Sequence, residues 1–153
     1  MASVSKSIDV AVPVGTAYNQ WTQFEAFPQF MEGVEKVMQI DDRRLHWKAR
    51  IAGKETEWDA EIAEQIPDVR IAWRATSGQK NAGSVDFHRL SEGMTRIVLV
   101  LETEPEGVIE TIGDHIGLLG RRVNGDLERF KDFIEKHGSE TGAWRGTVEA
   151  PKP

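Results

Sequence analysis

Residues 45–75 read LHWKARIAGKETEWDAEIAEQIPDVRIAWRA, and apolar and polar side chains alternate through most of this stretch. Successive side chains of a β-strand point to opposite faces of its sheet, so the alternation is typical of strands with one buried and one solvated face. Turn sequences at Ala52-Gly53-Lys54 and Pro67-Asp68 divide the stretch into three strands. Strands joined by such short turns run antiparallel, and the stretch therefore predicts a β-meander.

The alternation continues on both sides of this stretch. Residues 34–104 read as six strands separated by short turn clusters. Near the start of the chain, residues 3–12 alternate around Val4 and Val10 and predict a further strand, which Pro13 ends because proline has no N–H to donate to a neighbouring strand. Together these segments predict a seven-stranded, curved antiparallel sheet.

The sequence also predicts three helices. Residues 16–21 form two helical turns with Trp21 on the apolar side, and the aromatic segment 24–33 forms a second short helix or cap. After Pro105 the apolar period changes to three or four residues, which predicts a long C-terminal helix that Gly138 ends. Its apolar stripe consists of Ile109, Ile112, Ile116, Leu119, Val123, Leu127, Phe130 and Ile134.

These elements predict one α+β domain over residues 1–138, followed by a flexible polar tail over residues 139–153. A chain of 153 residues is long enough to bury a core without disulfides or metals. In the tail, Trp144 either anchors a protein partner or folds back on the body of the domain.

Composition excludes several classes of function. The net charge of -6 argues against non-specific nucleic-acid binding, which needs a concentrated basic face. The absence of cysteine excludes thiol catalysis and fits a reducing cytoplasm. We expect no stable membrane insertion, because no apolar run approaches the length of a membrane span and the N-terminus has no signal-peptide core. The four histidines show no metal-ligand spacing, and no nucleotide-binding loop is present, so we expect neither a metal nor a cofactor.

The apolar face of the sheet predicts either a filled core or a ligand pocket beneath the long helix. Two features favour a pocket: a curved sheet leaves more space than one helix fills, and Ala49, Ala60 and Ala75 on the same face are small. The sheet side would carry Trp47, Trp58, Trp73, Phe87 and Leu99, a lid would carry Phe27, Phe30 and Met31, and the helix side would carry Ile112, Ile116 and Leu119.

The order of elements resembles that of the helix-grip superfamily, which includes START lipid-transfer domains, birch-pollen-allergen-like proteins and polyketide cyclase/dehydrase proteins. The resemblance to the bacterial cyclase/dehydrase-like (SRPBCC) branch rests on Lys6-Ser7-Ile8-Asp9-Val10-Ala11-Val12-Pro13-Val14, on residues 21–31 (WTQFEAFPQFM) and on Trp58-Asp59-Ala60-Glu61-Ile62. It extends from Val4 to about His137. It implies a helix-grip fold but leaves the function open, because the superfamily includes lipid carriers, ring-closing enzymes and partner-binding domains.

Three functions follow as hypotheses. The first is a carrier or sensor of a small hydrophobic molecule, such as a lipid, isoprenoid or polyketide-like compound. The second is a polyketide cyclase, aromatase or dehydratase, which needs an ionisable side chain in the pocket. The predicted register turns His46, His88, Arg50 and Arg74 outward, so no catalytic residue is assigned, and Tyr18 and His115 are the only candidates. The third is a partner-binding domain that uses the acidic sheet face or the Trp144 tail.

Overall fold

The computed structural model describes residues 2–51, 54–77, 81–103 and 112–148, with side chains over 3–50, 55–77, 81–102 and 121–148. The strands form one seven-stranded antiparallel sheet in the order β1-β7-β6-β5-β4-β3-β2, as the alternation predicts. Their bounds are β1 Ala2–Val10, β2 Val34–Gln39, β3 Arg44–Ile51, β4 Lys54–Ile66, β5 Arg70–Ala75, β6 Asn81–Ser91 and β7 Met94–Thr103. The first strand ends two residues earlier than predicted, and Val12 beyond it is buried and accepts a hydrogen bond from the Thr95 hydroxyl at 2.9 Å.

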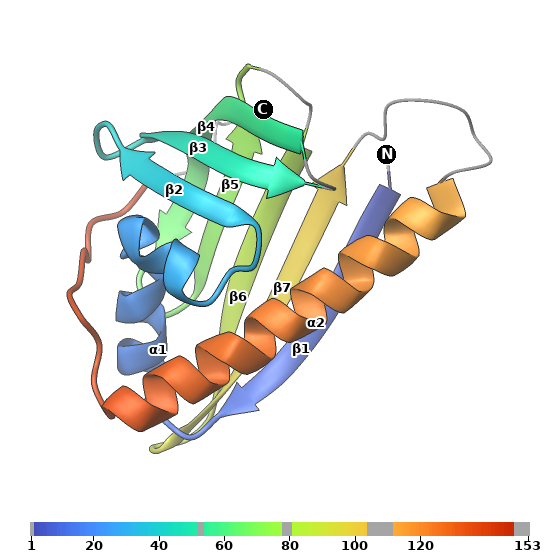
Figure 1. Ribbon diagram of the computed structural model, residues 1–153. Helices are drawn as coiled ribbons and strands as arrows, with labels where there is room; N and C mark the ends of the chain where they lie inside the picture. The colour runs from blue at the N-terminus through green and yellow to red at the C-terminus, as the bar shows by residue number, and fades with distance from the viewer. Residues whose placement is uncertain (1, 52–53, 78–80, 104–111, 149–153) are drawn as a thin grey trace, which may run out of the picture.

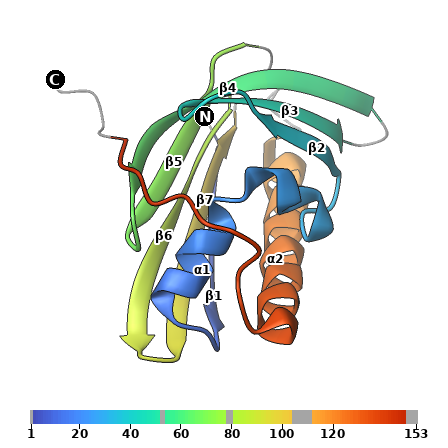
Figure 2. The same ribbon diagram turned by 90° about the vertical axis from the view of Figure 1, so that its left-hand side faces the viewer.

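The helices lie on the concave side of this sheet. Two short ones, α1 (Val14–Trp21) and the 3₁₀ helix η1 (Phe24–Gln29), follow β1, and the long helix α2 (Ile112–His137) closes the fold. The sheet bends around α1 and α2, with α2 crossing β1, β7 and β6 (Figures 1 and 2). Helix α2 ends where predicted, at Gly138 with φ 69°. This arrangement confirms the predicted helix-grip α+β fold.

Burial follows the predicted alternation along the strands. Leu45, Trp47 and Ala49 of β3 are buried, and the residues between them are more exposed. The alternation holds along β4 as far as Ile62, where the pairing with β5 shifts by one residue. This bulge turns the Gln65 side chain inward, because one extra residue in a strand exchanges the inward and outward positions of the residues that follow it.

Aromatic side chains fix the C-terminal half of α2 to the rest of the fold. The ring of Phe130 lies 5.1 Å from those of Trp21 and Phe30, and Phe27 lies 5.4 Å from Trp21 (centroid distances). All four residues are at most 1% exposed. Rings at such separations, mostly inclined edge to face, contribute stability beyond the area that they bury.

Polar contacts from α2 hold the segment between η1 and β2. The Asp126 carboxylate accepts a hydrogen bond from the Glu32 amide at 2.9 Å and pairs with Arg129, whose Nε donates to the Phe30 carbonyl at 3.0 Å. Arg122 donates from Nε and Nη2 to the Glu32 carbonyl at 2.9 and 2.6 Å. We call this set of contacts the α2 clasp. Burial raises the pKa of Asp126, and the Glu32 amide and Arg129 oppose that shift.

Residues 139–148 run along α1 to the far end of β4 (Figures 1 and 2). Gln20 and Thr141 exchange two hydrogen bonds of 2.8 and 3.0 Å. The backbone of Val148 exchanges two more, both of 2.8 Å, with the backbone of Gln65. Trp144 is partly buried against the core. Of the two alternatives that the sequence left open for Trp144, the structure shows the one in which it folds back on the body of the domain. No sequence pattern predicts the other contacts of this segment.

The convex face of the sheet carries cross-strand ion pairs. Lys48 Nζ lies 2.7 Å from Glu55, and His46 Nδ1 lies 2.7 Å from Asp59, with its other ring nitrogen 3.4 Å from Glu57. The predicted outward position of His46 is therefore confirmed. The hydrogen bond to Asp59 is the largest cause of the raised pKa of His46.

Replacing Asp126 with alanine tests the α2 clasp. We expect the free energy of unfolding in urea to fall by about 1–3 kcal/mol, because the part-buried Glu32 amide and Arg129 lose their acceptor. Asp126→Asn keeps an acceptor for the Glu32 amide and should lose less stability than Asp126→Ala. Asp132→Ala, on the same helix but at an exposed position, is the matched control. Equal losses in Asp126→Ala and Asp132→Ala would contradict the clasp.

A titration of His46 tests the convex face. In ¹H–¹⁵N NMR, we expect its pKa to lie above the ordinary histidine value and to fall towards that value in Asp59→Asn. Because the folded-state pKa is the raised one, the contribution of His46 to stability is complete below the ordinary pKa and is lost as the pH rises through the folded-state value. An unchanged pKa in Asp59→Asn would contradict the assigned pair.

Candidate functional site

Three tryptophans form a continuous wall on the concave face of β3, β4 and β5. Trp47 and Trp58 are direct cross-strand partners, and their rings stack at 5.9 Å with an interplanar angle of 6°. Trp73 lies 6.4 Å from Trp47 at 25°. The structure thus brings the three tryptophans together, as their positions in three successive strands predict.

Small residues make room for these rings. Ala60 pairs with Leu45 on one side and Ala75 on the other, which leaves space between Trp47 and Trp73. Gly83 is the direct partner of Trp73 on β6. A Cβ atom at this position would lie 2.5 Å from the Trp73 ring, so only glycine lets the indole lie across β6.

The wall is covered less completely than the aromatic cluster around Trp21. Trp47 is 5% exposed, Trp73 is 7% exposed and Trp58 is only partly buried, whereas the aromatic cluster around Trp21 is sealed. Large aromatic rings with accessible surface on a concave face are suited to contact with an apolar molecule.

The other predicted pocket residues fall into three groups. Phe87 and Leu99 lie on the same face as the wall and are 5% and 2% exposed. Phe27 contacts the wall, with its ring centroid 5.7 Å from that of Trp47. Phe30 packs beside Phe130 in the core, and the following residue, Met31, is also buried. The side chains of the remaining candidates lie outside the described residues: Ile112, Ile116, Leu119 and the catalytic candidate His115.

Tyr18 and Gln65 form a polar region at the other end of the interior. The Tyr18 ring packs edge to face on Phe87 at 5.4 Å, and the guanidinium carbon of Arg145 lies over the Tyr18 ring, 5.5 Å from its centroid. Burial raises the pKa of Tyr18, partly offset by Gln65, so the phenol is protonated at neutral pH. Sequence reasoning missed Gln65, and the only signal was the end of strict alternation after Ile62.

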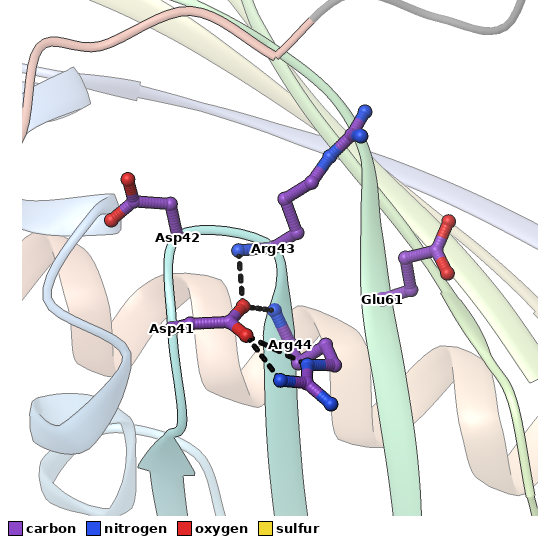
Figure 3. A pocket seen from close by; sticks show the side chains of 5 residues that line it. All are labelled: Asp41, Asp42, Arg43, Arg44 and Glu61. Carbon is purple, nitrogen blue, oxygen red and sulfur yellow. Dashed lines mark hydrogen bonds and ion pairs between the residues drawn. The ribbon is translucent and has the colours of Figure 1, made fainter.

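A hollow of ≈ 540 Å³ lies elsewhere, on the outside of the fold at the β2–β3 turn, and is lined by Asp41, Asp42, Arg43, Arg44 and Glu61 (Figure 3). Asp41 accepts hydrogen bonds from the backbone amides of Arg43 and Arg44, both at 2.9 Å, and from the Arg44 side chain at 2.7 Å. Asp41 and Arg44 form an ion pair, and all five side chains that line the hollow are charged. The tryptophan wall is therefore the better candidate site.

Two other kinds of site find no support in the described parts of the chain. There, no three histidine, aspartate or glutamate side chains are placed to hold a metal ion. Within the same residues, no helix has both the length and the apolar character needed to cross a membrane.

The chain was compared with known protein families and with known proteins. The family model for polyketide cyclase/dehydrase and lipid transport matches residues 10–132. An uncharacterised 17.2 kDa protein of Streptomyces lincolnensis is 53% identical over 149 residues, which cover 97% of this chain and 99% of that protein.

Solved structures agree in fold at lower identity. A START superfamily protein from Mycobacterium smegmatis superposes with a TM-score of 0.76 at 16% identity, over 88% of this chain and 98% of that one. An aromatase/cyclase from Streptomyces sp. R1128 superposes with a TM-score of 0.71 at 15% identity, over 94% and 99% of the two chains. The match to the family model, which covers residues 10–132, decides the assignment: this chain belongs to the polyketide cyclase/dehydrase and lipid transport family.

Proposed function

We propose that this protein binds and carries a small hydrophobic molecule, of the lipid, isoprenoid or polyketide-like kind, against the tryptophan wall. The observation that carries the proposal is the stack of Trp47, Trp58 and Trp73 on the concave face, in which Trp58 is only partly buried, whereas the aromatic cluster around Trp21 is sealed. The family description, which names lipid transport, supports the same function.

Affinity for such a ligand would come mainly from apolar area removed from water, at about 25 cal/mol per Å². Flat, stacked indoles suit this purpose because they offer a large apolar surface that is already held in place. Here the stack is fixed by pairing across β3 and β4, so little side-chain freedom would be lost on binding. We place this carrier in the cytoplasm, as the cysteine-free sequence suggests.

Truncating Trp58 tests the proposal. With the neutral apolar dye N-phenyl-1-naphthylamine, we expect Trp58→Ala to raise the Kd about tenfold, the equivalent of roughly 1.4 kcal/mol of lost contact. Leu90→Ala, which removes an exposed apolar side chain 46% accessible on β6, is the control and should bind as the wild type does. Near-UV circular dichroism checks that both variants keep their packing. Unchanged binding by a folded Trp58→Ala would reject the site.

A second candidate function is a cyclase or dehydratase that acts on a polyketide-like chain. One observation favours it: Tyr18 puts a protonated hydroxyl inside the fold, beside Phe87, and this hydroxyl has no hydrogen-bond partner of normal geometry. A neutral phenol can donate a proton or polarise a carbonyl group. The ion pairs of His46, Arg74 and Arg96 occupy the convex face instead, away from the wall.

Tyr18→Phe separates the two functions. For a carrier, we expect the variant to bind the dye within twofold of the wild type, and to be at least as stable, because it loses an unpaired buried hydroxyl. We also expect the wild type to leave a poly-β-ketone thioester unchanged in a chromatographic assay. Cyclised product that the wild type forms and Tyr18→Phe does not would instead establish the enzyme.

The third hypothesis, a partner-binding domain, has less support. Its anchor, Trp144, is partly buried against the same chain, where its amide donates to the Thr22 hydroxyl at 3.1 Å. A partner would first have to displace this contact.

A further inference from the structure

The interior contains buried polar atoms whose hydrogen bonds are unmade, and nearly all are donors. Six side-chain nitrogen or oxygen atoms are buried without a partner among the residues that the structure describes. Only the Asp68 oxygen can act solely as an acceptor, and it belongs to the β4–β5 turn. The other five are Trp21 Nε1, Trp47 Nε1, Trp58 Nε1, Gln65 Nε2 and Tyr18 Oη.

Two of these donors belong to the tryptophan wall. The indole N–H groups of Trp47 and Trp58 come from one stacked cross-strand pair, on the face that the proposed ligand would contact. Trp21 differs, because it lies in the sealed cluster between Phe27, Phe30 and Phe130. Both donor atoms are buried, and of the two side chains that of Trp58 is the more exposed.

An indole nitrogen can only donate a hydrogen bond, and in folded proteins most buried donors have an acceptor. A pure hydrocarbon on the wall would leave both N–H groups unmatched. A ligand rich in hydroxyl groups could accept from the N–H groups, but its own O–H donors would find no acceptor on the indole rings. A ligand with carbonyl or ether oxygens on an apolar body would match both the rings and the N–H groups.

We propose that the wall selects apolar molecules that carry hydrogen-bond acceptors, and that the indole N–H groups of Trp58 and Trp47 are the specificity-determining donors. This inference rests on the proposed carrier function and narrows its ligand class. The rings supply the non-directional apolar contact, and the two N–H groups distinguish a carbonyl-bearing chain from a hydrocarbon of the same shape.

Two isosteric probes test the selectivity: 2-decanone, and 2-methyl-1-decene, in which a methylene replaces the carbonyl oxygen. Displacement of N-phenyl-1-naphthylamine gives their relative affinities. We expect the wild type to prefer the ketone roughly fivefold beyond the ratio set by the two probes' solubilities in water, as one net hydrogen bond predicts. In Trp58→Phe, which keeps an aromatic ring but loses the N–H, this preference should fall towards one. Trp144→Phe, on the C-terminal segment, should keep it.

The indole region of a ¹H–¹⁵N spectrum gives an independent readout. The chain has five tryptophans, and Trp→Phe variants assign their N–H signals and show by signal dispersion that each variant is folded. The ketone, but not the alkene, should move the Trp58 or Trp47 proton downfield and leave that of Trp144 in place. Equal affinities with unmoved indole signals would overturn the selectivity while leaving an apolar carrier intact. Failure of both probes and of the dye to bind would remove the carrier function and this inference together.

Discussion

The structure depends on the period of two in antiparallel strands, which sends every second side chain to the concave face. Because β3 and β4 pair residue for residue, Trp47 and Trp58 must lie side by side, and Lys48, Glu55 and Glu57, which alternate with the inward residues, must lie on the convex face. The same pairing that builds the sheet therefore also builds the tryptophan wall. A shift of one residue in that register would put the indoles in water and the ion pairs in the interior.

The interior consists of two parts with different packing. Around Trp21, Phe30 and Phe130 the rings are sealed, and the α2 clasp holds the adjoining chain segment through Asp126 and Arg129. Along the wall, the small residues Ala60 and Gly83 leave room for the indole rings. We infer that the sealed part supplies stability and holds the sheet in its bent shape, while the wall is left for binding. This division explains how a chain of 153 residues can keep a stable fold and still offer apolar surface.

Most of the fold could be predicted from the sequence, because the elements that form it have long, regular apolar periods. The inward positions of Trp47, Trp58 and Trp73 follow from alternation alone, and the end of α2 follows from Gly138. Gln65 could not be placed, since its inward turn depends on a bulge that the pairing of β4 with β5 creates. The other contacts that were missed join residues far apart in the chain, such as those of the α2 clasp and of residues 139–148, and no local pattern marks them. The sequence pattern also cannot predict whether the pocket residues hold a ligand, because a filled core and a ligand-binding wall have the same apolar periodicity.

Native mass spectrometry of the protein, purified gently from its own cells and compared with a denatured sample, tests the central claim most directly. If the tryptophan wall carries a small hydrophobic molecule, the native protein will show a reproducible added mass that denaturation removes, and that mass will be absent from a folded Trp58→Ala variant. A native mass equal to that of the bare chain in repeated preparations would contradict the account.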